Sequence, residues 1–302
     1  MEIIESLQGI TSGGPCALAL GAFDGLHRGH MAVVEAAVSG AKTRGYVPGV
    51  FTFQKNPGGA LELLTPEDKA LILRRAGVEK LFSLDFESLK DMTAEQFVRD
   101  LLFEKLCARH ICCGEDFRFG RGAEGDVGLL RALSKEAGTE LTVLSPVNSG
   151  GEKISSTRIR KAAEAGDSID CYELLGRPLG FCAQVVHGNH IGGSVLGTPT
   201  INQVLPEGFI QPRFGVYAAW CICGKELHYG VCNIGVKPTV GSDRVLAETW
   251  MPEFSGDLYG ERVRVELVEF LRPERKFDSL EELKAAIQAN GEQARALTVG
   301  AE

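Results

Sequence analysis

The sequence predicts an α/β chain with a parallel sheet in its first part and an antiparallel β-barrel, followed by one helix, in its second. Up to Leu175, short apolar runs alternate with segments of helical spacing, which is typical of a parallel sheet covered on both faces. From Gly176, strand-like runs follow one another across polar or glycine-bearing turns, which favours a barrel. We therefore expect two domains, at residues 1–175 and 176–302.

The first half contains the helix-start signals expected of alternating strands and helices. Thr65–Asp68 is a helix start with proline at the first helical position, and Thr93–Gln96 has the form of a capping box. The expected strands are Cys16–Leu20, Val47–Phe53, Leu81–Phe86, His110–Gly114 and Leu141–Leu144. The expected helices are Arg28–Arg44, one from Pro66, Phe97–Leu106, Leu129–Ala137, Lys161–Ala165 and a connector at Asp167–Leu175.

The second half contains a hairpin-turn signal and only one clear helix start. Gly224–Glu226 is a good hairpin turn, and only the end returns to a helix, which begins at the capping box Ser279–Glu282. The expected strands are Cys182–His187, Val216–Cys223, Leu227–Ile234, Val245–Trp250 and Arg262–Phe270.

Composition excludes several classes of protein. The net charge of −8 and the absence of a Lys/Arg cluster argue against a nucleic-acid partner. No apolar run approaches the roughly 18 residues of a membrane span, and the first residues lack signal-peptide features. Nine cysteines without a regular framework suit a reducing cytoplasm, which is the expected location. We interpret Cys112, Cys113, Cys221 and Cys223 as small buried side chains, because zinc-ligand spacing is missing.

A glycine-rich turn at Gly21–His30, with the sequence G-A-F-D-G-L-H-R-G-H, joins the first strand to the first helix. Its glycines allow a sharp turn and a close approach to a ligand. A helix that begins at two histidines offers N–H groups and a positive dipole end to an anion, and imidazoles there can donate to a triphosphate. The alternative is a pair of helix-start histidines exposed to water. The candidate ATP- and phosphate-binding residues are Gly21, Phe23, Asp24, Gly25, His27, Gly29 and His30.

A second motif, S-S-T-R-I-R, also leads into a helix. Its hydroxyls can cap that helix, and Arg160 can grip a phosphate with its planar fork. By itself the motif could equally be a capped helix with surface arginines. Together with H-x-G-H it indicates a nucleotidyltransferase. It adds Ser155, Ser156, Thr157 and Arg160 to the candidate site.

Along nearly its whole length the chain resembles the bacterial bifunctional riboflavin kinase/FMN adenylyltransferase (FAD synthetase) family. In the first half the resemblance rests on Gly21–His30, Gly114–Gly120, Gly125–Asp126 and Ile154–Arg160. In the second half it rests on Leu175–Pro178, Val186–Gly188, Pro199–Asn202, Gly215–Tyr217, Asn233–Thr239, Glu248–Thr249, Asp257–Gly260, Phe270–Arg272 and Lys276–Phe277.

The resemblance implies a Rossmann-like nucleotidyltransferase domain followed by a riboflavin kinase barrel. The barrel would phosphorylate riboflavin with ATP to give FMN, and the first domain would transfer AMP from ATP to FMN, giving FAD and pyrophosphate. Both reactions would use Mg²⁺. The implied partners are these small molecules, with neither nucleic acid nor membrane, and the oligomeric state is left open.

The resemblance also implies residue roles. His27 and His30 would act on the α-phosphate in adenylyl transfer, and Glu248 would be the catalytic base of the kinase. Asp116 and Phe117 would shape the flavin side of the adenylyltransferase site. Thr200 and Asn202 would bind Mg²⁺ and phosphate in the kinase. The phosphate-binding loop of the kinase would comprise Gly188, Gly192, Gly193, Gly197, Pro199, Thr200 and Asn202.

Two segments depart from the family pattern. Gln54–Pro57 stands where the family usually has D-P-H-P, and the kinase loop has Ser194 and Thr198 in place of an arginine and a phenylalanine. Three readings therefore stay open: a bifunctional enzyme, an enzyme with only one of the two activities, and a non-catalytic flavin-binding or regulatory protein. The intact H-x-G-H, S-S-T-x-I-R and Glu248 favour an enzyme.

Overall fold

The structure, a computed structural model, describes residues 1–10, 13–187, 200–239 and 242–299. It forms two compact units, one of Met1–Glu62 with Pro66–Ser155, the other of Leu63–Thr65 with Ser156–Glu302. Helices α5 (Ser156–Ala165) and α6 (Ser168–Leu175) thus group with the barrel. The division reflects which residues pack together and does not show where a domain that folds by itself begins. The boundary expected at 175/176 therefore stays a prediction.

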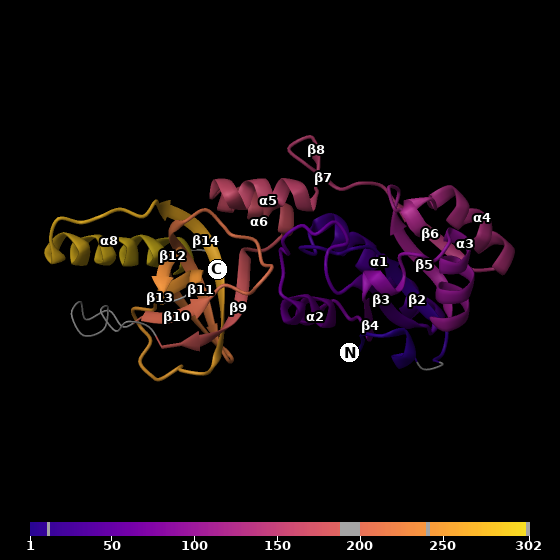
Figure 1. Ribbon diagram of the computed structural model, residues 1–302, viewed down its shortest axis with the longest axis horizontal. Helices are drawn as coiled ribbons and strands as arrows, with labels where there is room; N and C mark the ends of the chain where they lie inside the picture. Colours follow the sequence, from indigo (N-terminus) through magenta and orange to yellow (C-terminus); the bar gives the residue numbers. More distant parts are fainter. Residues whose placement is uncertain (11–12, 188–199, 240–241, 300–302) are drawn as a thin grey trace. The chain divides into compact units, whose positions relative to one another are not determined.

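The first unit is built on a parallel sheet, as predicted (Figure 1). The sheet has six strands in the order β1-β4-β3-β2-β5-β6. Its strands are β1 (Glu2–Ile4), β2 (Cys16–Leu20), β3 (Val47–Phe53), β4 (Lys80–Leu84), β5 (Ala108–Gly114) and β6 (Glu140–Leu144). The edge strand β1 escaped prediction because three residues are too few to display a period. A short hairpin, β7 (Asn148–Ser149) with β8 (Glu152–Lys153), follows the sheet.

Helical segments lie between the strands of this sheet. They are η1 (Leu7–Gly9), α1 (Arg28–Arg44), α2 (Pro66–Arg75), η2 (Phe86–Ser88), α3 (Ala94–Gln96), η3 (Phe97–Lys105), η4 (Arg121–Ala123) and α4 (Val127–Ala137). The capping box at Thr93 is confirmed. The helix expected at Phe97–Leu106 is present, and it is a π-helix: the N–H of its C-cap residue, Leu106, reaches the Leu101 carbonyl at 2.9 Å.

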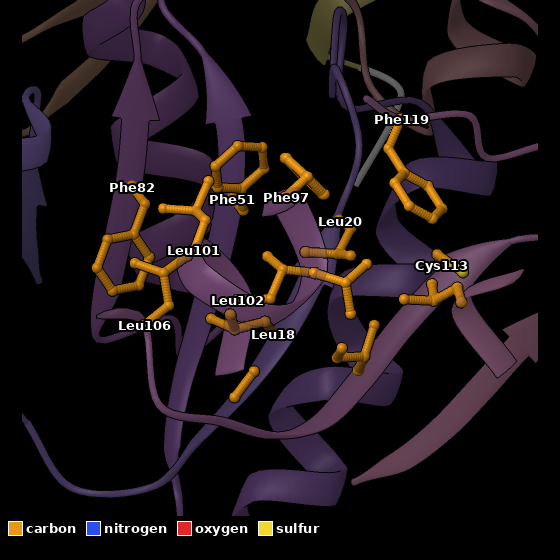
Figure 2. Close-up of a cluster of buried hydrophobic side chains, with 14 of the residues drawn as sticks. Leu18, Leu20, Phe51, Phe82, Phe97, Leu101, Leu102, Leu106, Cys113 and Phe119 are labelled. Atoms are coloured by element: carbon orange, nitrogen blue, oxygen red, sulfur yellow. The ribbon is translucent and has the colours of Figure 1, made fainter. Parts of the chain in front are cut away.

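The central strand β2 separates two packing layers. Leu18 and Leu20 join a cluster with Phe51, Phe97 and Leu101 on one face (Figure 2). Alternation directs the side chains of Ala17 and Ala19 to the other face, where α1 packs against β2, β3 and β5. Small residues on that face let the helix come close to the strand. The helix start that follows β2 is thereby anchored to the centre of the sheet.

The second unit contains a closed antiparallel barrel with the order β10-β13-β12-β11-β14-β9, which confirms the predicted fold (Figure 1). Its strands are β9 (Leu179–Val186), β10 (Thr200–Val204), β11 (Gly215–Cys223), β12 (Glu226–Thr239), β13 (Ser242–Trp250) and β14 (Arg262–Arg272). Strand β10 had not been expected, because T-I-N-Q-V resembles a phosphate loop. Strand β12 also continues beyond the expected end at Ile234.

The last helix, α8 (Leu280–Val299), packs on the outside of the barrel against β11, β12 and β14 (Figure 1). Ala294 of α8 is fully buried in a cluster with Val216 and Val231. A Cβ on Gly291 would lie 2.8 Å from the Trp250 ring, so the helix needs a residue without a side chain there. In the described ranges, no helix combines the length and apolarity required to cross a membrane.

Candidate active sites

The turn between β2 and α1 has an unusual backbone. Phe23 and Leu26 adopt positive φ angles of 48° and 42°, and Gly25 one of 78°. Non-glycine residues in this region are strained, and such strain is held in place by surrounding contacts and clusters at functional sites. The Thr52 hydroxyl supplies one of these contacts, since it donates to the Ala22 carbonyl at 2.7 Å. The turn is therefore fixed before it meets any ligand.

His27 caps α1 with its own side chain. Its Nδ1 accepts a hydrogen bond from the His30 N–H at 3.2 Å, so the neutral ring carries its proton on Nε2. The ring is only 6% exposed and stacks on His30. Gly29 leaves room for it, because a Cβ there would lie 3.3 Å from the imidazole. For His27, the alternative of a histidine exposed to water is wrong.

His30 is held as a neutral imidazole. Burial, the neighbouring His27 and the ammonium group of Lys69 together lower its pKa well below the usual 6.5. Phe23 packs edge-on against the ring with centroids 5.4 Å apart. The Nδ1 atom is covered and has no hydrogen-bond partner among the described residues. A buried ring nitrogen without a partner is costly, and a ligand group at this helix start can remove that cost.

Lys69, in the first turns of α2, is a charged residue that the sequence reasoning missed. It is 6% exposed, and burial lowers its pKa, while the carboxylates of Glu62 and Asp24 oppose that shift. Asp24 itself is 3% exposed. The helix start at Pro66 predicts a helical lysine, but nothing in the sequence indicates that its ammonium group is buried near the histidines.

Asp116 and Phe117 follow β5. The Asp116 carboxylate pairs with Lys153 of β8, and the hydrogen bond from that lysine holds the pKa of Asp116 below its usual value of 3.8. Lys153 also contributes to the low pKa of His30, and His27 to that of Asp116. Phe117 stacks on Phe119 with ring centroids 5.6 Å apart. The structure thus brings Asp116 into the electrostatic neighbourhood of the H-x-G-H histidines.

The S-S-T-x-I-R motif forms the start of α5, as expected. Ile159 is fully buried, and Arg158 forms an ion pair of 2.8 Å with Asp170 of α6. Arg158 is therefore engaged in an ion pair with the neighbouring helix. Arg160, two residues further along α5, is half-buried. Ser155 ends the first unit, and Ser156, Thr157 and Arg160 belong to the second. That the two motifs act on one nucleotide stays a prediction.

The segment that departs from D-P-H-P makes local hydrogen bonds. Gln54 donates through Nε2 to the Glu5 carbonyl at 3.0 Å. Asn56 donates through its backbone N–H to Glu62 Oε1 at 2.7 Å and through Nδ2 to the Ala60 carbonyl at 3.1 Å. These side chains therefore hold the loop together.

In the barrel, Glu248 lies between two asparagines. On β13 it is the register partner of Asn202 on β10 and of Asn233 on β12. Register partners in antiparallel strands point to the same face, with Cβ atoms about 4.5–5.5 Å apart. Thr249 points to the opposite face and is fully buried. The strands thus set an amide, a carboxylate and a second amide in one row.

The barrel unit also has a pocket of about 400 Å³. Its lining comes from Val185 of β9, from Thr200 and Ile201 of β10, and from Met251 and Phe254–Tyr259. Tyr259, one of the lining residues, stacks on His187 with ring centroids 4.0 Å apart. The pocket is large enough to hold part of a nucleotide or flavin.

Of the residues expected to bind phosphate and Mg²⁺ in the kinase, the structure describes Thr200 and Asn202. Thr200 is half-buried and Asn202 is 8% exposed. The other expected residues of the kinase loop lie outside the described residues; they are Gly188, Gly192, Gly193, Gly197 and Pro199. The departures at Ser194 and Thr198 lie outside them as well. In the part of the chain that is described, no three His, Cys, Asp or Glu side chains gather as a metal site.

Comparison with known proteins gives matches along the chain. A family model described as FAD synthetase matches residues 10–158, and one described as riboflavin kinase matches residues 175–298. A bifunctional riboflavin kinase/FMN adenylyltransferase of Escherichia coli K12 is 36% identical over 285 residues, covering 90% of this chain and 89% of that protein. One of Pseudomonas fluorescens is 35% identical over 293 residues and covers 93% of each.

A solved structure is also similar. The crystal structure of a protein from Streptococcus pneumoniae, titled a macrolide-efflux protein, has a TM-score of 0.87 and 30% identity, covering 97% of this chain and 98% of that one. Its title names a different activity from the two family models and the curated relatives.

Proposed function

Because the chain belongs to the bifunctional riboflavin kinase/FMN adenylyltransferase family, we propose that it carries out both reactions itself. It transfers the γ-phosphoryl group of ATP to riboflavin, giving FMN, and then transfers AMP from a second ATP to FMN, giving FAD and pyrophosphate. The observation that carries the proposal is that each unit holds its own polar constellation, the stacked histidines in one and the Glu248 row in the other.

In adenylyl transfer, a phosphate oxygen of FMN attacks the α-phosphorus of ATP, and the bond from that phosphorus to the bridging oxygen breaks. The nucleophile is already anionic, so no strong base is required. Negative charge grows on the leaving pyrophosphate. The start of α1 and the Nε2–H of His27 would stabilise it, and Ser155 of the same unit would help to align the nucleotide. The phosphate-binding roles expected for Thr157 and Arg160 stay predictions.

In phosphoryl transfer, the terminal hydroxyl of riboflavin attacks the γ-phosphorus and loses its proton. Glu248 would accept that proton, because a carboxylate beside the attacking alcohol is a suitable base. Its place between Asn202 and Asn233 supports this role, since both amides can orient the groups around it. The nucleotide would enter from the pocket beside Thr200.

Mg²⁺ fits the oxygen donors of Thr200 and Asn202. A hydroxyl and an amide oxygen are hard ligands, and Mg²⁺ usually takes few protein ligands together with substrate phosphates. When bound, the ion would neutralise phosphate charge. We also propose the cytoplasm as the location, because all nine cysteines are free thiols, as suits a reducing compartment.

A second candidate function is an enzyme with one activity only, either kinase or adenylyltransferase, because each half departs from the family pattern, at Gln54–Pro57 and at Ser194 and Thr198. The purified protein is incubated with riboflavin and Mg-ATP, and separately with FMN and Mg-ATP, and the flavins are resolved by chromatography. FMN from the first mixture and FAD from the second support both reactions. Failure of one conversion identifies the lost activity, and failure of both contradicts the proposal.

A further inference from the structure

The segment between β14 and α8 is tied down at several points. We call residues 272–277 the strap. Arg272 donates through Nε to Asn290 Oδ1 on α8 at 3.1 Å. The guanidinium groups of Arg272 and Arg275 lie 5.5 Å and 4.6 Å from the centroid of the Phe277 ring. These contacts fix the strap, so Glu274 between them has a defined direction.

Glu274 reaches back onto strand β12. Its Oε1 accepts a hydrogen bond of 3.0 Å from Asn233 Nδ2. Its carboxylate also lies over Gly235, where a Cβ would be 2.5 Å from Oε1. Asn233 and Gly235 are two apart on one strand, so they share a face of the sheet. The missing side chain at Gly235 makes room for the carboxylate.

The contact lies next to the base assigned to the kinase. Asn233 is the register partner of Glu248, and Asn202 flanks Glu248 on its other side. Two side-chain hydrogen bonds therefore connect α8, the strap and β12, the strand next to Glu248. They do not require any residue of the loop at 188–199.

The hydrogen bond to Glu274 uses the Nδ2 atom of Asn233 and leaves its Oδ1 atom without a donor among the described residues. The commitment of Nδ2 prevents the amide from flipping, and Oδ1 is covered. A buried acceptor without a donor is unfavourable, whereas a site built to bind a hydroxyl discriminates strongly against ligands that lack one. A hydroxyl group that donates to Oδ1 would remove this cost.

We propose that Asn233 Oδ1 accepts a hydrogen bond from a hydroxyl of the acceptor's polyol chain, beside the hydroxyl that is phosphorylated. Glu274 is the positioning residue that fixes the amide. The pair thereby selects flavins that carry a polyol chain. This inference rests on the proposed kinase function.

The test uses the full-length chain and two flavins, without nucleotide or metal. Flavin fluorescence gives the Kd of riboflavin and of lumiflavin, which has a methyl group in place of the ribityl chain. In Asn233→Ala and Glu274→Ala, we expect the preference for riboflavin over lumiflavin to fall about tenfold, as for loss of one hydrogen bond to a buried acceptor. Glu281→Ala, at an exposed carboxylate of α8, is the matched control and should keep the preference.

A double substitution separates positioning from folding. Asn233→Asp alone sets two carboxylates against each other and should lose the preference. Adding Glu274→Gln reverses donor and acceptor, since the new amide donates to the new carboxylate, and should restore it. An unchanged preference in the single variants, or equal weakening of both flavins, would overturn the inference. Absence of FMN formation by the unaltered protein would instead count against the proposed function.

Discussion

The imidazole rings of His27 and His30 stack with centroids 3.6 Å apart and planes inclined by 13°. Such a stack is compatible with neutral rings, because two imidazolium ions at this separation would repel each other. The low pKa of His30 keeps that condition at neutral pH. The hydrogen bond from the His30 N–H to His27 fixes the orientation of both rings. The pair thus acts as one rigid unit at the start of α1.

Replacing either histidine should therefore abolish most of one activity. In His27→Ala or His30→Ala, FAD formation from FMN should fall about a hundredfold or more, the usual loss when a preorganised donor to developing charge is removed. Conversion of riboflavin to FMN, measured on the same samples, serves as the internal control and should survive. Normal FAD synthesis by both variants would refute the roles given to them.

The same low pKa predicts a pH dependence of stability. His30 and the buried His110 both have pKa values below the usual 6.5. The unfolded chain therefore binds more protons than the folded chain below that value, and stability falls as the pH drops. Urea midpoints at about pH 7.5 and about pH 5.5 measure the effect, in a range above most carboxyl titrations. The drop should be smaller in His30→Ala, and an equal drop would contradict the assignment.

Glu248→Gln preserves the shape of the side chain and removes the base. FMN production should fall by roughly 10²–10⁴, the contribution of general base catalysis. Adenylylation of added FMN should be unaffected, because it belongs to the other constellation. Full kinase activity in this variant would show that Glu248 is not the catalytic base and that another residue has that role.

Gly40, in the middle of α1, faces His110. A Cβ there would lie 2.3 Å from His110 Nδ1, so Gly40→Ala has to displace a buried ring. Overpacking of this kind costs about 1–3 kcal/mol, which outweighs the roughly 1 kcal/mol that alanine adds to a helix. We expect a lower free energy of unfolding in urea.

The His110→Ala background checks this explanation. With the ring removed, Gly40→Ala should become neutral or stabilising, because only the helix propensity remains. Destabilisation of similar size in both backgrounds would place the clash elsewhere.

The division of the chain can be tested with fragments. A fragment of residues 176–302 should fold cooperatively by circular dichroism and convert riboflavin to FMN, because the barrel closes within it. Residues 156–302, which add α5 and α6, provide the comparison. If only the longer fragment folds, the two helices belong to the barrel, and the boundary at 175/176 must move to the start of α5. A fragment of residues 1–175 should make FAD only when FMN is supplied.

The sequence predicts the architecture better than the local chemistry of the sites. The apolar run Cys16–Leu20 and the helical stripe after it place His27 and His30 at a strand-to-helix turn, and the structure confirms that turn. Gly224 likewise has the positive φ that its hairpin needs. These features are readable because each depends on residues close together in sequence.

What could not be predicted depends on contacts between distant residues. The burial of Lys69 beside Asp24 and the bond from Asn233 to Glu274 join segments that no local period relates. Strand β10 was not predicted because its residues Thr200 and Asn202 also suit a phosphate-binding loop. The π-helical hydrogen bonding at Leu106 leaves an apolar pattern like that of an ordinary helix.

Strands β9 and β10 are partners in the barrel, with Asn202 opposite Val186 and Gln203 opposite Val185. This pairing closes the barrel, so each of its six strands has a hydrogen-bonded neighbour on both sides. A closed sheet offers no unpaired row of N–H and C=O groups to a strand of another molecule. Closure of the barrel therefore removes one route by which the second unit could aggregate during synthesis or storage.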